Sequence, residues 1–202
     1  MLPEDAQRRA FACYVVGLTS PLERKSMEPI AVRMRPAAPD AAHQALHHFI
    51  SQSRWDDAQV RRYGLAWGLW AATAYGPVER CVIDDTGTLK QGTHSVGVAR
   101  PYTGTAGKIT NCQITVTLAV CTARETVPVD LQLYLPEAWA ADPTRRRAAR
   151  IPDAVLFEPK WMIALDMLRR ARAHDVPLGR TVLADADYGR VPDFRAGVLA
   201  LV

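Results

Sequence analysis

Two short apolar runs in the sequence each lead into aspartates and then into residues typical of turns. Residues 81–87 are Cys-Val-Ile-Asp-Asp-Thr-Gly, which places Asp84 and Asp85 after a strand-like run. Residues 181–189 are Thr-Val-Leu-Ala-Asp-Ala-Asp-Tyr-Gly and repeat the design with Asp185 and Asp187. Ligand and metal sites gather at the carboxyl ends of strands in mixed α/β sheets. We therefore expect Asp85 and Asp185 to lie side by side and to form an oxygen-rich site suited to Mg²⁺ or Mn²⁺.

The alternation of side chains along a strand limits which of these aspartates can share a metal ion. Asp84 and Asp85 must point to opposite faces, so only one of them can contribute. The other would cap the following turn or pair with a neighbouring charge. Each run taken alone also fits an ordinary strand-to-turn ending. The two runs together favour a metal, because an isolated buried carboxylate is costly and a divalent cation would stabilise both as anions.

Length and composition exclude several classes of protein. The chain has 202 residues, of which 49% are hydrophobic, enough for a real core and too many for a disordered chain. Its net charge of +4 and pI of about 9.0 are compatible with a nucleic-acid partner. The first ten residues lack the apolar segment of a signal peptide, and no apolar run approaches the roughly 20 residues that span a bilayer. The four cysteines have no C-x-x-C spacing, which favours reduced thiols of a cytoplasmic protein over zinc ligands or disulfides.

Helical spacing dominates the first part of the sequence. Apolar residues recur at helical intervals over residues 4–18, and Ser20 followed by Pro21 and Glu23 predicts a helix that starts there and stops before Pro36. Further helices are expected over residues 42–50 and from Asp56 or Asp57 to about residue 74. Residues 1–75 are thus predicted to be an all-helical module, with Trp55, Trp67 and Trp70 in helix cores.

The second part, residues 76–202, has the pattern of a mixed α/β domain. Strands are expected over residues 78–85, 109–121, 126–135 and 182–185, the second with clear alternation of apolar residues. A helix is expected over residues 159–174. Residues 136–153 are polar, and we expect them to be irregular, with Arg145 to Arg150 as an exposed charge run.

Several of these segments resemble bacterial insertion-sequence transposases of the DDE superfamily. The resemblance begins at the first catalytic segment of that family, which is similar to Ile83-Asp84-Asp85-Thr86-Gly87 and Lys90-x-Gly92-x-His94-Ser95-Val96-Gly97-Val98-Ala99-Arg100. It continues, in the family's order, at Asn111-Cys112-Gln113, Leu133-Tyr134-Leu135-Pro136-x-x-Trp139 and Ala184-Asp185-x-x-Tyr188-Gly189. Upstream, Ser20-Pro21-x-Glu23-Arg24-Lys25 and Arg54-Trp55-Asp56 also fit, so the matches cover roughly residues 10 to 200.

The resemblance implies a fold and a mechanism. It implies an α/β (α+β) ribonuclease-H-like mixed sheet flanked by helices, preceded by a helical DNA-binding module. Asp85, rather than Asp84, matches the family's first catalytic metal ligand, and Asp185 at the end of the fourth strand matches the second. Asp84 and Asp187 would support them from nearby. Two Mg²⁺ or Mn²⁺ ions would then promote in-line attack on a phosphodiester, which cleaves and transfers DNA strands.

The resemblance also implies the partners. The ligand would be double-stranded DNA at transposon ends, in the bacterial cytoplasm at the nucleoid and away from membranes, and a homodimer is one candidate assembly. Lys90, Arg100 and Lys108, on loops after the first strand, and Arg54 in the helical module are candidates for phosphate contacts.

One departure from the family concerns its third acidic ligand, a glutamate on a helix after the second aspartate. No Glu follows Asp185 in this sequence, where Asp187 and Asp193 are the remaining acidic residues. We therefore expect a C-terminally truncated transposase that is inactive alone. One alternative is a non-catalytic DNA-binding regulator derived from such a transposase. Another is a metal nuclease of the same fold whose partner chain supplies the Glu.

Overall fold

The computed structural model describes residue 2, residues 4–104 and residues 106–201 of the 202-residue chain. These residues form two compact units, Met1–Gly64 and Leu65–Val202. The division falls inside helix α4 (Asp57–Thr73), rather than after residue 75, because Leu65, Leu69 and Ala72 of that helix pack against the core of the second unit. No helix of the described residues is long and apolar enough to cross a membrane.

The first unit is helical, as the sequence predicts. Helices α1 (Asp5–Thr19), α2 (Met27–Met34) and α3 (Pro39–Ser51) pack around Ile30, Ala31, Ala42 and Leu46. A second small cluster holds Phe49, on which the ring of Trp55 stacks with centroids 5.6 Å apart. Trp55 is thus in a helical core, as expected.

The expected helix start at Ser20 is wrong. The residues after it form a loop, and α2 begins only at Met27. Ser20 instead ends α1: its backbone N–H donates to Gly17 O at 3.3 Å and its hydroxyl donates to Val16 O at 2.7 Å. A serine committed to the end of one helix is not free to cap the next.

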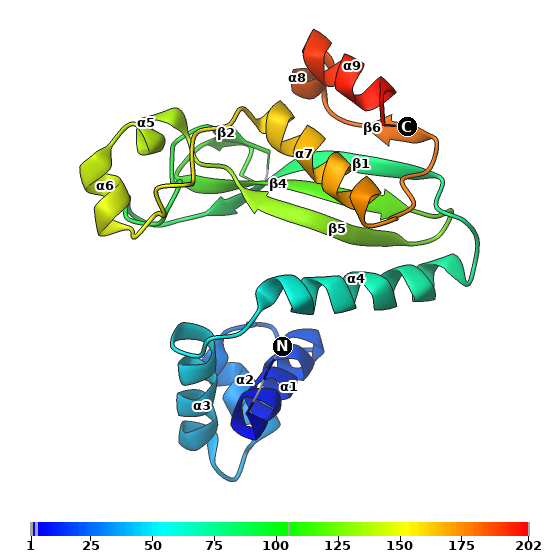
Figure 1. Cartoon of the computed structure of the whole chain (residues 1–202). Coiled ribbons are helices and arrows are strands. Elements are labelled where there is room, and N and C mark those ends of the chain that lie inside the picture. Colours follow the sequence, from blue (N-terminus) through cyan, green and yellow to red (C-terminus); the bar gives the residue numbers. More distant parts are fainter. Residues whose placement is uncertain (1, 3, 105, 202) are drawn as a thin grey trace. The chain divides into compact units, whose positions relative to one another are not determined.

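The second unit is built on a four-stranded mixed sheet with the order β5-β4-β1-β6 (Figure 1). Strand β1 (Arg80–Leu89) is antiparallel to β4 (Cys112–Cys121), which is antiparallel to β5 (Thr126–Leu133). Strand β6 (Thr181–Leu183) joins the other side of β1 in parallel. Three antiparallel strands in a row, followed by a helix and a parallel fourth strand beside the first, are the arrangement expected for a ribonuclease-H-like fold. The predicted fold class is confirmed.

Helix α7 (Lys160–Ala173) covers one face of the sheet and forms the main core with it. The alternation predicted for β4 holds, since Val116, Leu118 and Val120 are buried. They pack with Cys81 and Ile83 of β1 against the apolar side of α7. Trp67 and Trp70 of α4 do not join this core: their exposed fractions are 71% and 72%, so the expectation of helix-core positions is wrong for both.

Strand β1 is longer than the sequence analysis expected. It does not end at Asp85 but continues to Leu89, because its pairing with β4 runs unbroken from Arg80↔Cys121 to Leu89↔Cys112. What ends near Asp85 is the pairing with β6, whose last partner on β1 is Val82. Asp85 therefore lies where β1 has a neighbour on one side only.

The segment between β5 and α7 is partly helical, whereas the sequence analysis predicted irregular structure. It contains the short helices α5 (Glu137–Ala140) and α6 (Pro143–Ala148). The guanidinium of Arg145 lies 3.6 Å from the ring centroid of Trp139, and its Nη2 donates to Thr93 O at 3.0 Å. Arg146 donates to Val155 O and Pro152 O. These arginines hold backbone carbonyls in place and are not a simple solvated charge run.

The loop between β1 and β4 is fixed by side chains from the motif segments. Asn111 donates to Gly92 O, Gln113 to Val96 O and Trp139 to Val98 O, at 3.1, 2.6 and 2.8 Å. Gly97 has a φ of 74°, and a Cβ there would lie 2.8 Å from Tyr134 O, so glycine is required. Within this loop, β2 (Tyr102–Thr103) and β3 (Lys108–Ile109) form a small hairpin.

The end of the chain returns to β1. Gly179, with a φ of 74°, passes so close to the backbone of Glu79 that a Cβ would lie 2.3 Å from its carbonyl. Helices α8 (Ala186–Gly189) and α9 (Pro192–Leu199) follow β6, and the buried Tyr188 and Phe194 connect them to the core below α7. The close passage at Gly179 allows β6 to pair with β1.

Candidate active site

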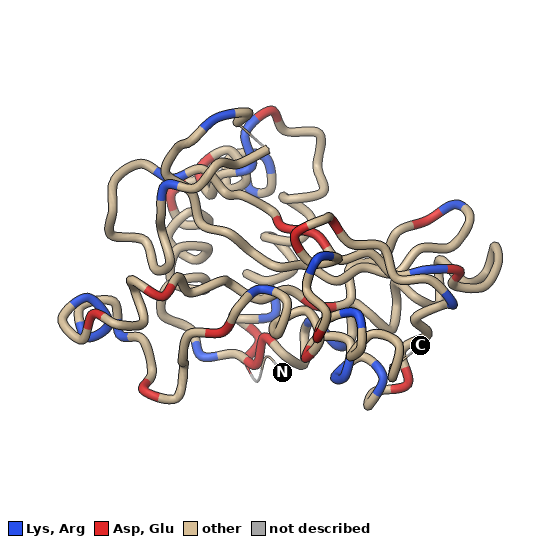
Figure 2. The backbone as a smooth tube through the Cα atoms, turned by 90° about the horizontal axis from the view of Figure 1, so that it is seen from above, with Lys and Arg blue, Asp and Glu red and all other residues tan. Residues whose placement is uncertain are grey.

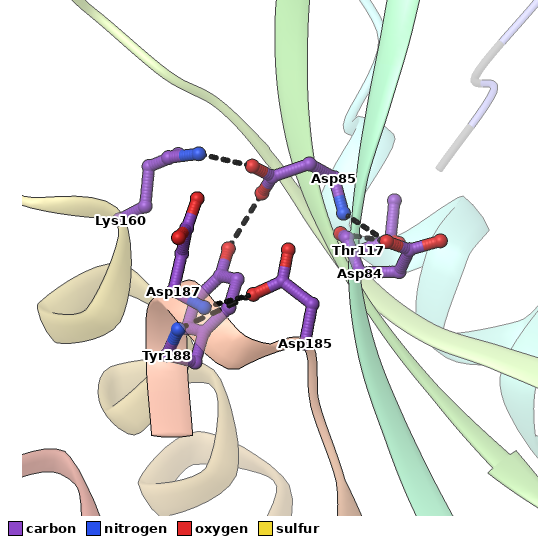
Figure 3. A network of polar contacts seen from close by, with 7 residues as sticks. All are labelled: Asp84, Asp85, Thr117, Lys160, Asp185, Asp187 and Tyr188. Carbon is purple, nitrogen blue, oxygen red and sulfur yellow. Dashed lines mark hydrogen bonds and ion pairs between the residues drawn. The ribbon is translucent and has the colours of Figure 1, made fainter. Parts of the chain in front are cut away.

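The parallel pairing of β1 with β6 brings the two predicted aspartates to the same end of the sheet. The register pairs Val82 with Leu183, and Asp84, Asp85 and Asp185 follow within three residues on their strands. In Figure 3 the carboxylates of Asp85 and Asp185 point toward the same space, whereas Asp84 points to the other side of β1. This is the opposite-face arrangement expected from strand alternation.

Asp85 is held by two side chains from distant parts of the sequence. Tyr188 donates its hydroxyl to Oδ1 at 2.6 Å, and the Nζ of Lys160 forms an ion pair with Oδ2. Only 18% of the Asp85 side chain is exposed, against 33% for Lys160. An anion this far from water is costly unless it is paired and hydrogen-bonded, and these two donors satisfy both of its oxygens.

Asp185 is held differently, by backbone alone. Its Oδ1 accepts from the backbone N–H groups of Asp187 and Tyr188, at 2.9 and 3.2 Å, so it caps the N-terminus of α8. Its side chain lies on the exposed surface. In the part of the chain that the structure describes, Oδ2 of Asp185 has no hydrogen-bond partner, which leaves one oxygen free to bind a ligand.

Tyr188 connects the two aspartates. Its backbone N–H is bound to Asp185 and its hydroxyl to Asp85, while its ring packs against Phe194 with centroids 5.6 Å apart. Burial, and then the hydrogen bond and charge of Asp85, raise the pKa of the Tyr188 phenol far above its ordinary value of 10.0. The phenol therefore stays protonated and acts as a permanent hydrogen-bond donor to Asp85.

The other two aspartates have smaller roles in this geometry. Asp84 accepts from the backbone N–H of Asp85 at 2.8 Å, and its carbonyl accepts from the hydroxyl of Thr117 at 3.0 Å. It neither caps a turn nor forms an ion pair with a described residue. Asp187 is exposed and lies 3.9 Å from Arg190 in a loose ion pair.

The donors at this site fit a hard divalent cation in type and fall short in number. Asp85 and Asp185 supply carboxylate oxygens, which Mg²⁺ and Mn²⁺ prefer. Among the described residues, however, no group of three or more His, Cys, Asp and Glu side chains is placed to hold a metal ion. The four cysteines are free thiols, and burial raises the pKa of Cys81 to about 11. The site is therefore two converging carboxylates, with the ammonium of Lys160 paired to Oδ2 of Asp85.

The candidate DNA-contacting residues lie in both units. Arg54 is exposed in the loop between α3 and α4 of the first unit. In the second unit Lys90 is half-buried directly after β1, Arg100 is exposed before β2, and Lys108 is exposed within β3 rather than in a loop. Figure 2 shows Lys and Arg interspersed with Asp and Glu along the described backbone.

Lys160 was missed by the sequence analysis, although a signal for it exists. It is the first residue of α7, directly after the N-cap Pro159, and the first turn of that helix has no acidic residue. A cation is unfavourable at this end of a helix, where the macrodipole is positive. A lysine there predicts a nearby anion, and that anion is Asp85.

Comparison with known proteins shows the family of the chain. The DDE superfamily endonuclease family matches residues 1–201 of the chain. The chain is also 32% identical, over 189 residues, to a protein of Microchaete diplosiphon described as a probable transposase for insertion sequence element IS701. That match covers 94% of this chain and 45% of the relative, so the chain spans about half the length of the curated relative it matches.

The family match covers both compact units, including β1, β6 and the residues that hold Asp85 and Asp185. Endonucleases of this superfamily generally use divalent metal ions, and transposases act on DNA. With the ribonuclease-H-like sheet and two carboxylates converging at its end, the chain belongs to the DDE superfamily endonucleases.

Proposed function

We propose that this chain is the DNA-binding and metal-binding part of an insertion-sequence transposase, in which Asp85 and Asp185 are the first two catalytic metal ligands. The observation that carries the proposal is the parallel β1–β6 pairing, with Tyr188 bonded to both aspartates. The substrate would be double-stranded DNA at transposon ends. Its place would be the bacterial cytoplasm at the nucleoid, and a homodimer is the assembly to test first.

The chain's own residues prepare the site for this chemistry. Divalent ions, when bound, would polarise a scissile phosphodiester and stabilise the leaving oxygen. Tyr188 fixes the carboxylate of Asp85 from one side, and the N-terminus of α8 fixes that of Asp185. Asp84 and Asp187 lie beside these residues and would support them. Rigid, preoriented carboxylates lower the reorganisation needed when charge develops on the phosphate.

We further propose that the 202-residue chain alone does not cleave DNA at a measurable rate. Two carboxylates can anchor one ion, but a second ion would lack an anionic anchor among the described residues. The test is a strand-cleavage assay on duplexes from the DNA flanking the coding sequence, in Mg²⁺ and in Mn²⁺. Cleavage by the intact chain that disappears in Asp85→Ala would overturn this part of the proposal, and Asp187 and Asp193 would be the first candidates for the missing ligand.

Metal binding tests the site itself, independently of activity. A titration with Mn²⁺, followed through the electron paramagnetic resonance of the free ion, should show weaker binding for Asp85→Asn and for Asp185→Asn than for the unaltered chain. Asp175→Asn, exposed after α7 and outside the site, is the matched control with the same loss of one charge. Equal binding by all four proteins would remove Asp85 and Asp185 from the proposed metal site.

A second candidate function is a regulator that holds DNA without cutting it. The absence of a third acidic ligand among the described residues favours it. Affinity for duplex DNA should fall steeply with salt, because bound phosphates release counterions. Arg54→Ala, Arg100→Ala and Lys108→Ala should each reduce the slope of log affinity against log salt by about one if the residue contacts phosphate. A slope unchanged in all three variants would remove these residues from the DNA interface.

A further inference from the structure

A lysine occupies the cation position of the candidate metal ligand. The Nζ of Lys160 is paired with Oδ2 of Asp85, and the hydroxyl of Tyr188 binds Oδ1. Each oxygen of Asp85 therefore already has one partner, and an ion that binds Oδ2 must share this oxygen with the ammonium or displace it. The ammonium also places a positive charge where the ion would bind, and like charges in such a partly buried place repel strongly.

The two donors differ in their freedom to leave. Tyr188 is 2% exposed, its ring packs against Phe194, and its backbone is fixed by the cap of α8. Lys160 stands on the first turn of α7 with a third of its side chain exposed, on a flexible stem of four methylene groups. The donor that can move is Lys160.

We propose that Lys160 is a positioning residue that competes with the divalent ion for Asp85. Without metal, its ammonium pairs with Oδ2 and holds the carboxylate of Asp85 in place. When the ion binds, the ammonium gives up Oδ2 and turns toward solvent, while Tyr188 keeps Oδ1. The lysine thus sets the metal concentration at which the site fills. This inference rests on the proposed metal-binding role of Asp85.

The experiment measures the dissociation constant of Mn²⁺ for the full 202-residue chain by electron paramagnetic resonance. Lys160→Met keeps the apolar stem and removes the competing charge, so Mn²⁺ should bind roughly tenfold more tightly, the ratio expected for loss of one charge-assisted hydrogen bond. Lys160→Arg restores a cation and should return the affinity toward that of the unaltered chain. Arg172→Met, exposed near the other end of α7, removes the same charge away from the site and should leave the affinity unchanged.

The outcomes separate this inference from the proposed function. If Asp85→Asn binds Mn²⁺ as well as the unaltered chain, the metal role of Asp85 fails and the inference fails with it. If Asp85→Asn weakens binding but Lys160→Met does not tighten it, or Arg172→Met tightens it equally, the metal site stands and competition by Lys160 is wrong. If Lys160 had only a structural role, its removal would leave the Mn²⁺ affinity unchanged or lower it. If Lys160→Met does not fold, Lys160→Gln is measured with the same expectations.

Discussion

The surroundings of Asp85 and of Asp185 differ although both aspartates face the same space. Asp85 is largely buried on a long central strand and is bound by a tyrosine and a lysine from segments 103 and 75 residues away. Asp185 is exposed after a three-residue strand and is bound by backbone N–H groups two and three residues further on. One carboxylate therefore depends on tertiary structure and the other on local structure. This difference predicts unequal effects when each side is altered.

The largest effect is expected from removing the residue that serves both sides. Tyr188→Ala should lower the free energy of unfolding of the second unit by about 3–5 kcal/mol, because it opens a cavity beside Phe194 and removes the hydroxyl that binds Asp85. Amide hydrogen exchange in β1 and β4 reports on this unit separately from the helical one. Tyr188→Phe, which keeps the ring, should cost about 1–3 kcal/mol. Equal losses in the two variants would show that the hydroxyl, and not the packing, dominates.

The two aspartates should differ when each is truncated. Asp85→Ala leaves a buried hydroxyl and a half-buried ammonium without their acceptor and should destabilise the second unit by about 1–3 kcal/mol. Asp185→Ala removes only the cap of a four-residue helix and should cost about 1 kcal/mol or less. Amide hydrogen exchange in β1 compares the losses of stability in the two variants. A greater loss for Asp185→Ala would reverse the assignment of tertiary and local roles.

High pH should destabilise the second unit through the raised pKa values of Tyr188, which binds Asp85, and of Cys81. The folded-state pKa of Tyr188 is raised above its ordinary value of 10.0, so its contribution to stability is complete below pH 10 and is lost as the pH rises further. The pKa of the Cys81 thiol is raised from 9.0 to about 11, so its contribution to stability is likewise lost as the pH rises from 9 to 11. Stability measured from pH 8 to 11 should therefore fall, and less steeply in Tyr188→Phe. Parallel curves for the two proteins would contradict the shift of Tyr188.

The smallest effect is expected at Asp187. Its side chain is exposed and its ion pair with Arg190 spans 3.9 Å, so Asp187→Ala should change the free energy of unfolding by less than about 0.5 kcal/mol. Thermal unfolding of Asp187→Ala, measured beside that of Asp185→Ala, compares the two losses of stability. A loss as large as that of Asp185→Ala would mean that Asp187 takes part in holding α8 in place.

Patterns in the sequence predicted the elements of the sheet better than the contacts between them. Alternation of apolar residues located β4, and short apolar runs located the first and last strands, because burial dictates those patterns. The extension of β1 past Asp85 was not predictable from Thr86-Gly87, since pairing with β4 overrides the turn preference of that dipeptide. The predicted helix start at Ser20 was wrong for a related reason, because a serine can end one helix as well as begin the next.

The candidate site was predicted in part. The two aspartates follow from their place after apolar runs, and Tyr188 was within a motif segment. The position of Lys160 in a helix's first turn signals a nearby anion, but neither the identity of that anion nor the bonds of Tyr188 could be predicted. The partners of Asp85 are brought to it by α7 and α8 from far along the chain. The roles of Arg145 and Arg146 were missed likewise, since stacking on Trp139 and bonding to distant carbonyls leave no periodic pattern.

The short β1–β6 pairing has a consequence for folding kinetics. Its three residue pairs join positions about 100 residues apart, whereas β1, β4 and β5 form from strands that follow one another along the chain. Closing so long a loop for so few contacts is entropically unfavourable, so this step should come late, after the antiparallel strands and α7 have assembled. Asp85 would then be in place before Asp185 during folding. The rate at which Mn²⁺ binding appears during refolding would therefore measure the docking of β6 on β1.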